Sequence, residues 1–215
     1  NDWMKKYTGY LKDVEGSVIH GGKHVPYQDT GGRWTIGYGK LISKNDLGEG
    51  KLKEKKLGYG DKTIKIWVGG TSWDEKEAEQ ALQKEASLSL HQAEIYAKNK
   101  GFDWGKISDR QKYGLADFVY NLGYGSMTNP YQLPSGKMSD QDLFHDTMGA
   151  YLSGENVVSS GDPNISHKRH VITSKGNFEL KYRNKKWKDL FGGSQKEGEL
   201  IMGSMLKLDN PLGMV

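Results

Sequence analysis

Cysteine is absent from the 215 residues of the chain. Disulfide bonds and thiol chemistry are therefore excluded, and cysteine usage points to no particular redox compartment. No stretch approaches the roughly 18 consecutive apolar residues of a membrane-spanning helix. Residues 1–10 are amphipathic and lack the apolar core of a signal peptide. A protein of this kind that acts outside a cytoplasm would need some other means of delivery.

Neither sign of charge dominates. The chain has 31 Lys and Arg against 27 Asp and Glu, which gives a formal net charge of +4 and a pI near 8.9. A modest positive charge favours an anionic partner such as nucleic acid, an anionic membrane or a bacterial cell-wall polymer, although a slightly basic soluble protein has the same composition. With 35% hydrophobic and 27% charged residues, the chain is expected to be soluble and globular. Its length suits one domain, or a domain with a second lobe.

The first part of the chain changes from helical to extended patterning. Apolar residues follow helical spacing at Trp3, Tyr7, Tyr10, Leu11 and Val14, and Gly16 is a natural stop, so a first helix is expected to end near Glu15. Glycines are dense from there to about Val68. Residues 33–36 and 63–68 are typical of strands, with a turn at residues 29–32 between strands. These features predict a small antiparallel sheet.

The pattern becomes helical again after Thr71. Ser72 and Glu75 fit a capping box, which predicts a helix to about Lys98. Ser108 is expected to cap a helix that runs to Leu122 and is apolar nearly all round, as a buried central helix would be. Two further helices are predicted, one from Ser139 and one over roughly residues 177–191.

The expected fold class is α+β, with a sheet lobe inserted between a first helix and a helical lobe. The main domain is predicted over residues 1–191. Its sheet lobe covers about residues 16–70, and its helical lobe is formed by residues 1–15 and 71–191. Residues 192–215 are predicted to be a Gly-Gly-Ser linker and a C-terminal tail.

Two acidic residues suit glycoside hydrolysis, which uses one carboxyl as a proton donor and a second, ionised one to activate water or attack the sugar. Glu15 suits the first role, because the C-terminal end of a helix disfavours negative charge. Asp29 suits the second, in a polar turn beside a strand that carries Thr35, whose hydroxyl can hold a water. The structural alternatives are a solvated Glu near a helix end and an Asp that forms a turn before Gly-Gly. These residues alone leave both interpretations open.

Residues 34–39 read Trp-Thr-Ile-Gly-Tyr-Gly, and this string resembles the signature of the phage-type lysozyme family. In that family a Glu-Gly pair ends the first helix, and a Tyr-x-Asp turn precedes the string. The further matches here are Glu15-Gly16, residues 27–29, the Phe-Val-Tyr-Asn-Leu-Gly of residues 118–123 and, more weakly, residues 167–169 and 187–191. The resemblance covers about residues 1–191, and four motifs in the family's order make it specific.

The resemblance implies a lysozyme-like fold, with the active-site cleft between the two lobes. It also implies hydrolysis of the β-1,4 bond between N-acetylmuramic acid and N-acetylglucosamine with inversion, and no cofactor. By position, Glu15 is the general acid, and Asp29 with Thr35 places the attacking water. The substrate-contacting positions correspond to Leu41, Tyr120 and Asn121, although Tyr120 also suits plain packing on a core helix.

The sequence departs from the family pattern between Ser17 and Tyr27, where residues 20–24 lengthen the segment between acid and base. A hairpin that bulges away from the cleft would leave the site intact, whereas a loop that bends over it would change access. His20 and His24 lie in this segment, but their spacing lacks the Glu of a zinc peptidase helix, and no metal is expected. The Lys-rich residues 51–56 are most simply a solvated face and could also attract the anionic wall polymer.

Three other functions are compatible with parts of the sequence: a lytic transglycosylase, a wall-binding virion module without catalysis, and a basic nucleic-acid binder. The spacing of Asp29 and Thr35 argues against the first, retention of the acid and base argues against the second, and the third lacks a motif. Peptidoglycan is the expected partner. The apolar residues of the tail could also associate with a virion protein or a second copy. The enzyme could be released from the host cytoplasm at lysis or carried in the virion tail.

Overall fold

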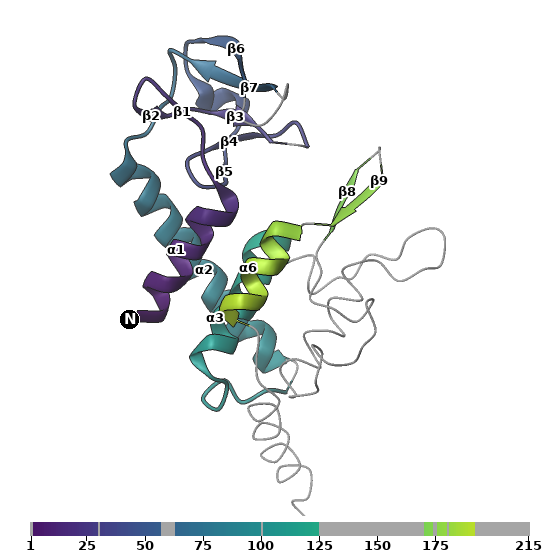
Figure 1. Cartoon of the computed structure of the whole chain (residues 1–215). Coiled ribbons are helices and arrows are strands. Elements are labelled where there is room, and N and C mark those ends of the chain that lie inside the picture. The colour runs from purple at the N-terminus through teal and green to yellow at the C-terminus, as the bar shows by residue number, and fades with distance from the viewer. Residues whose placement is uncertain are drawn as a thin grey trace, which may run out of the picture. The chain divides into compact units, whose positions relative to one another are not determined.

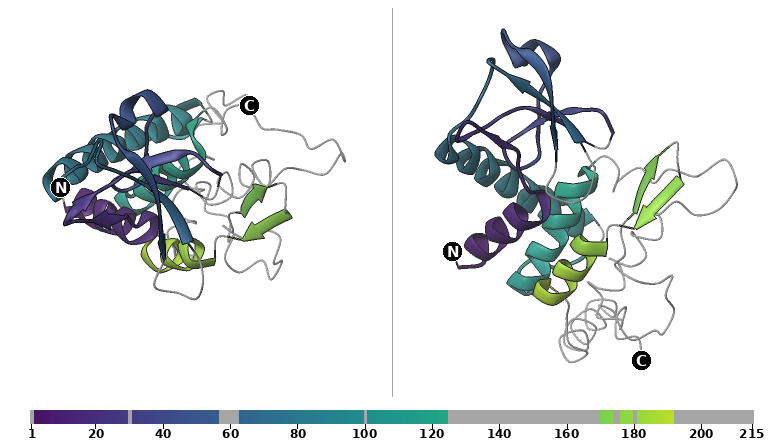
Figure 2. Two further views of the ribbon diagram at one scale, coloured as in Figure 1. Left: turned by 90° about the horizontal axis from the view of Figure 1, so that it is seen from above. Right: turned by 45° about the horizontal axis from the view of Figure 1, so that its top comes forward.

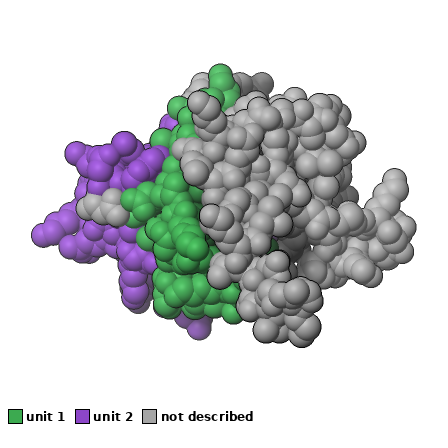
Figure 3. Space-filling model, turned by 90° about the horizontal axis from the view of Figure 1, so that it is seen from below, with its two compact units in different colours: residues 1, 88–215 green, residues 2–87 purple. Residues whose placement is uncertain are grey.

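The computed structural model describes residues 2–29, 31–56, 63–99, 101–124, 170–173, 176–179 and 181–191. The chain divides into two compact units, which Figure 3 distinguishes by colour. We call residues 2–87 the first unit, which is purple and labelled unit 2 in Figure 3. Residue 1 and residues 88–215 are the second unit, which is green and labelled unit 1 there. The boundary falls within the long helix α2 (Glu75–Asn99), so this helix contributes to both units.

The first unit begins with helix α1 (Asp2–Glu15). Its buried side chains are Tyr7, Tyr10 and Leu11, which lie three and four residues apart and so share one face. The helix ends at Glu15 because Gly16 takes a positive φ of 62°, and the Gly16 N–H donates to the Lys12 carbonyl. The sequence-based prediction of this helix and its end is confirmed.

A five-stranded antiparallel sheet follows α1, with the strand order β5-β4-β3-β7-β6 (Figure 1). Its strands are β3 (Tyr27–Gln28), β4 (Trp34–Ile36), β5 (Lys40–Leu41), β6 (Lys51–Lys56) and β7 (Thr63–Val68). A short 3₁₀ helix, η1 (Lys44–Leu47), lies between β5 and β6. The predicted strands at residues 33–36 and 63–68 are confirmed as β4 and β7. The predicted turn between β3 and β4 is closed by the Gly32 N–H, which donates to the Asp29 carbonyl at 2.9 Å.

The longer segment between Ser17 and Tyr27 forms a hairpin of its own, a separate two-stranded sheet of β1 (Ile19–His20) and β2 (Lys23–His24). The two residues between the strands are glycines with φ of 60° and 77°, and a tight two-residue hairpin turn needs such positive values. Next to the hairpin, a hydrophobic cluster buries Val18, Val25 and Ile66, with Tyr27, Ile64 and Val68 packed against it.

The described part of the second unit is mainly helical. Helix α3 (Asp109–Leu122) begins at Ser108, whose hydroxyl accepts from the Gln111 N–H, as the capping prediction required. Helix α6 (Lys181–Phe191) packs against α3, and the two views of Figure 2 show them side by side. A small hairpin of β8 (His170–Thr173) and β9 (Gly176–Glu179) precedes α6.

Aromatic and charged groups hold α3 and α6 together. The Trp187 ring meets the Phe118 ring edge-on, with centroids 5.0 Å apart, and the Trp187 Nε1–H donates to the Gly114 carbonyl at 3.0 Å. Arg183 on α6 forms a buried ion pair with Asp117 on α3 through Nη2 and Oδ1. The interface therefore combines a hydrophobic core with one buried charge pair.

The α+β fold class expected from the sequence is confirmed, since the described residues form helices and an antiparallel sheet. Of the helices that the structure describes, none has the length and apolar character needed to cross a lipid bilayer. The domain boundaries at residues 16, 70 and 191 stay predictions. The helix expected from Ser139 and the tail at residues 192–215 lie outside the described residues.

Two local predictions are corrected. The capping box of α2 is formed by Asp74 and Glu77, which exchange backbone-to-carboxylate hydrogen bonds of 2.8 Å, and not by Ser72 and Glu75. The last helix begins at Lys181 rather than near residue 177, because residues 176–179 pair in β9. The Lys-rich residues 51–56 form strand β6, which pairs along its whole length with β7 and is exposed, as expected of a solvated face.

Candidate active site

Glu15 is the last residue of α1, and its side chain is partly buried. The carboxyl lies against the backbone of Gly39, the residue that follows the Trp-Thr-Ile-Gly-Tyr string. A methyl group on Gly39 would lie 3.1 Å from Glu15 Oε2, and Gly39 has a φ of 88°. Both the space and the conformation therefore require glycine here. This close approach brings the turn after β4 directly to the predicted acid.

Gly37, the other glycine of this turn, likewise allows a close approach, in this case to Trp73 and to α2. Gly37 has a φ of 58°, and a methyl group there would lie 3.1 Å from the Trp73 ring and 3.3 Å from Ala78 at the start of α2. The Gly-Tyr-Gly sequence thus lets the backbone pass closely between α2 and the end of α1. Tyr38 lies between the two glycines and is therefore the residue of the Gly-Tyr-Gly sequence that has a side chain.

Asp29 follows β3, and hydrogen-bond donors meet both of its carboxylate oxygens. The backbone N–H groups of Gly31 and Arg33 donate to Oδ1, both at 2.9 Å. The Arg33 guanidinium meets Oδ2 through Nε at 2.9 Å and Nη2 at 2.8 Å. Four donors correspond to the four lone-pair positions of an ionised carboxylate, so the group is fixed in orientation. Arg33 itself is 68% exposed.

The register of the sheet places Thr35 opposite two other residues of interest. Its Cα pairs with that of Tyr27 on β3 and with that of Leu41 on β5, so the three residues form one row across the sheet. Residues directly opposite on antiparallel strands project from the same face. Thr35 is 4% exposed, and its hydroxyl donates to the Arg33 carbonyl at 3.4 Å, whereas Leu41 is 51% exposed.

Tyr27 connects these residues. Burial first, and then the negative charges of Glu15 and Asp29, together raise the pKa of its phenol from 10.0 to about 12. Both carboxylates are therefore close enough to act on one phenol, and that phenol lies opposite Thr35. The β3–β4 pairing thus places Thr35 opposite Tyr27, and the charges of Glu15 and Asp29 both act on the Tyr27 phenol. Tyr27 belongs to a motif of the family but was not predicted to be part of the site, and its position two residues before Asp29 was the available signal.

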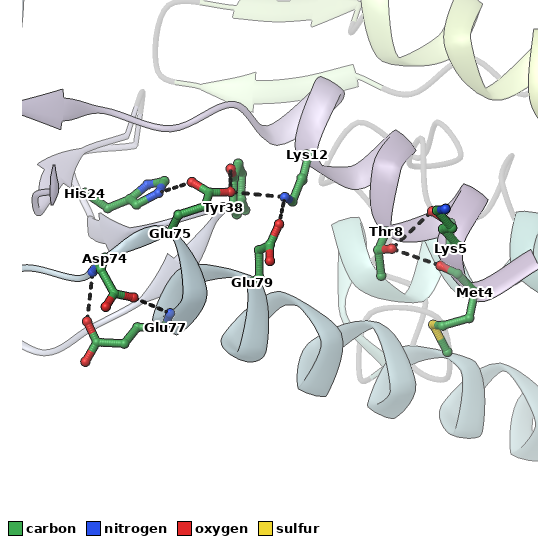
Figure 4. A network of polar contacts seen from close by, with 10 residues as sticks. All are labelled: Met4, Lys5, Thr8, Lys12, His24, Tyr38, Asp74, Glu75, Glu77 and Glu79. Carbon is green, nitrogen blue, oxygen red and sulfur yellow. Dashed lines mark hydrogen bonds and ion pairs between the residues drawn. The ribbon is translucent and has the colours of Figure 1, made fainter. Parts of the chain in front are cut away.

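A second group of polar residues surrounds Glu75, the first residue of α2 (Figure 4). The carboxylate accepts from Tyr38 Oη at 2.6 Å and from Lys12 Nζ at 3.0 Å, both through Oε1, and its Oε2 meets His24 Nε2 at 2.8 Å. Lys12 also meets Glu79. None of these residues was predicted to belong to the site, since no local pattern joins positions so far apart in the chain.

The remaining candidates fall elsewhere. Tyr120 and Asn121 lie in the last turn of α3, in the second unit, and are partly buried. His24 is buried against Glu75, whereas His20 is exposed on β1. Among the described residues, no group of three His, Asp or Glu side chains is arranged to hold a metal ion.

Comparison with known families matches residues 17–143 to the phage lysozyme family, which is more than half of the chain. The chain therefore belongs to the phage lysozyme family, and its fold is lysozyme-like. It is a glycoside hydrolase, a muramidase that degrades peptidoglycan. The matched range contains Asp29, Thr35, Leu41 and the end of α3, and it begins two residues after Glu15.

Among solved structures, the muramidase domain of SpmX from Asticaccaulis excentricus is similar to this chain at 13% sequence identity and a TM-score of 0.49. The similarity covers 88% of this chain and 97% of that domain. No curated protein matches the chain. The family assignment therefore depends on the family match alone.

Proposed function

We propose that this chain hydrolyses the β-1,4 bond between N-acetylmuramic acid and N-acetylglucosamine with inversion at the sugar carbon. In this proposal Glu15 is the general acid, and Asp29 and Thr35 position the attacking water. The observation that carries the proposal is the grouping of Glu15, Asp29 and Thr35 around Tyr27. Two carboxyl groups in different settings are what glycoside hydrolysis requires.

The acid step begins with a protonated Glu15. Its proton passes to the glycosidic oxygen as the bond from that oxygen to the sugar carbon breaks, and the leaving sugar departs with a neutral hydroxyl. The close backbone of Gly39 limits where the carboxyl can turn, which supports a fixed direction of proton donation. Preorganised geometry of this kind is a main source of rate enhancement.

The water step uses Asp29 and Thr35. A water that donates one hydrogen bond to Asp29 Oδ2 and one to Thr35 Oγ1 keeps a lone pair free to attack the sugar carbon. Its proton then passes to Asp29 as the new carbon–oxygen bond forms. Because Arg33 occupies Oδ2, its guanidinium must swing aside before water binds there. The exposure of Arg33 supports this movement, since little packing holds the side chain.

Three residues are proposed as substrate contacts: Leu41, Tyr120 and Asn121. Leu41 is an exposed apolar residue in the same row as Thr35, and its side chain is suited to the apolar face of a sugar ring. Tyr120 and Asn121 are proposed to contact the glycan from α3, where a phenol and an amide offer hydrogen bonds to sugar hydroxyl and acetamido groups.

The test of the acid is Glu15→Gln. An amide of the same size cannot deliver a proton, so turnover on purified peptidoglycan should fall by at least about 10²–10⁴-fold. Circular dichroism should show the fold of the parent. Activity within about tenfold of the parent would exclude Glu15 as the acid.

Product analysis distinguishes hydrolysis from lytic transglycosylation. Hydrolysis adds water, so the new muramic acid end is a reducing sugar, whereas transglycosylation yields an anhydro sugar that is one water lighter. We expect the heavier product, released as the inverted anomer in a fast NMR measurement. An anhydro product would instead assign the chain to the transglycosylases. A folded chain that yields neither product would be a wall-binding module.

The route to the wall is proposed to be either release from the host cytoplasm at lysis or delivery by the virion tail. Detection of the chain in purified virions would support the tail enzyme, and detection only in lysates would support the free endolysin.

A further inference from the structure

The Glu75 cluster, defined as Glu75 with Lys12, His24, Tyr38 and Glu79, joins four elements of the first unit. Lys12 belongs to α1, His24 to β2, Tyr38 to the turn between β4 and β5, and both glutamates to α2 (Figure 4). Each of the first three side chains meets the one carboxylate of Glu75. These elements are distant in sequence, so one residue at the start of α2 fixes three others against each other.

Two of these contacts lead directly to Glu15. Lys12 lies three residues before it, one helical turn away, and its carbonyl accepts the hydrogen bond that ends α1. Tyr38 directly precedes Gly39 in the chain, and the Gly39 backbone lies against the Glu15 carboxyl. Glu75 therefore holds the helix that carries Glu15 and also the turn that limits its movement.

We propose that Glu75 is a positioning residue for catalysis, and that it sets the position of the Glu15 carboxyl by fixing the end of α1 against the turn at residues 37–39. The proposal rests on the proposed function, since it takes Glu15 to be the acid. Glu75 does not touch the substrate. It acts through Lys12 and Tyr38, and His24 holds its second oxygen.

The chemistry of the cluster suits a permanent anchor. Hydrogen bonds from Tyr38, then from His24, and then from Lys12 lower the pKa of Glu75 from 4.5 to about 2. The carboxylate therefore stays ionised well below neutral pH. His24 is 1% exposed, and its ring meets the Tyr38 ring edge-on with centroids 5.3 Å apart. The anchor is therefore buried on the His24 side.

A merely structural function is the alternative, because an acidic residue in the first turn of a helix is common and favourable. Exposed ion pairs contribute little to the free energy of unfolding, and the Glu75 side chain is 56% exposed. Glu77 offers a matched control. It lies in the same first turn of α2, and its carboxylate accepts the Asp74 N–H, within α2 and its cap.

The experiment compares Glu75→Gln with Glu77→Gln on soluble glycan fragments. We expect Glu75→Gln to lower kcat about tenfold with KM changed less than about twofold, since a shift of about 1 Å at a reacting group can cost up to about 10²-fold. Glu77→Gln should keep the parent kcat despite any loss of thermal stability. Equal kcat values in the two variants would overturn the proposal.

A double-mutant cycle tests the route through Lys12. Lys12→Met alone should lower kcat, but in the Glu75→Gln background it should lower kcat by a smaller factor, because the contact between the two residues is already lost. Losses that multiply would overturn the route. If Glu75→Gln fails to fold, Tyr38→Phe removes a single hydrogen bond and is expected to lower kcat in the same way.

Glu15→Gln separates this proposal from the proposed function. If Glu15→Gln is inactive and Glu75→Gln retains the parent kcat, the positioning proposal fails and the proposed function stands. If Glu15→Gln remains active, the proposed function fails, whatever the result for Glu75→Gln.

Discussion

The two units each contain a conspicuous group of charges, and the groups differ in their surroundings. In the second unit, Asp117 and Arg183 pair in the interface of α3 and α6, with side chains 0% and 7% exposed. In the first unit, the Glu75 cluster is half open to solvent on the Glu75 side. A buried pair is costly to break because one charge would be left without its partner, whereas an exposed cluster adds little to stability. The comparison indicates that the Asp117–Arg183 pair maintains the fold, whereas the Glu75 cluster sets the geometry near the candidate site.

The largest expected effect is on catalysis in the first unit. Asp29→Asn should lower kcat by about 10²–10⁴-fold, because an amide cannot take the proton of the attacking water. Asp117→Asn should leave kcat per folded molecule unchanged. Rates on soluble glycan fragments, divided by the folded fraction from circular dichroism, give both values. A comparable loss of kcat in both variants would contradict the proposal that Asp117 serves stability and not catalysis.

The next effect is on stability in the second unit. Asp117→Ala should reduce the free energy of unfolding by about 3–5 kcal/mol, since it leaves the Arg183 charge buried. Glu75→Ala in the first unit should cost no more than about 1 kcal/mol. Urea denaturation followed by circular dichroism measures both, and similar losses would show that exposure does not distinguish the two groups.

Two glycines sharpen the comparison, since each has a neighbour that an added methyl group would meet. In Gly114→Ala the methyl group would lie 3.0 Å from Phe191 Cβ, which should cost about 1–3 kcal/mol of stability through overpacking, with kcat unchanged. Gly39→Ala should cost about 1–2 kcal/mol through its positive φ, and should also lower kcat because the methyl group displaces the Glu15 carboxyl. Thermal melts and turnover separate the pair. Unchanged kcat in Gly39→Ala would contradict the close approach to Glu15.

Lowering the pH should have a smaller effect on the free energy of unfolding, and the pKa of Glu75 sets its sign. The pKa of Glu75 is lowered by folding, so its stabilising contribution is fully present above the ordinary pKa of 4.5 and is lost as pH falls toward about 2. Unfolding free energies of Glu75→Gln should therefore vary less with pH over this range than those of the parent. Parallel curves for the two proteins would contradict the lowered pKa.

The smallest effect is expected at Arg33. Since its guanidinium must leave Asp29 before water binds, Arg33→Gln should keep kcat within about threefold of the parent. Initial rates on soluble fragments test this. A loss as large as that of Asp29→Asn would make the ion pair part of the working site.

Local signals predicted much of the fold. The end of α1 at Gly16, the Ser108 cap and strand β7 each follow from residues that are neighbours in the chain. Strand β6 was missed because its lysines are typical of a solvated face. It is a strand because it pairs with β7, and the sequence of β6 alone gives no signal of that pairing.

The residues of the candidate site also fall into those that the sequence predicts and those that it does not. Glu15, Asp29 and Thr35 were predicted as site residues because a family resemblance joined residues that spacing alone left ambiguous, and they stay a prediction. Tyr27 and Glu75 were missed as organising residues, because their importance comes from contacts between separate elements. Glu75 was even assigned to the wrong capping box, which local pattern alone could not distinguish from that of Asp74 and Glu77.

The row of Tyr27, Thr35 and Leu41 has a consequence for how this chain tolerates inserted residues. Side chains alternate between the two faces of a strand, so one residue added between Asp29 and Trp34 would turn Thr35 to the opposite face unless the loop absorbed it. The longer segment before Tyr27 escapes this constraint, because its extra length is folded into the separate β1–β2 hairpin. Short insertions at Gly21-Gly22 should therefore leave the row of Tyr27, Thr35 and Leu41 in register, whereas a single residue added after Asp29 should disturb it.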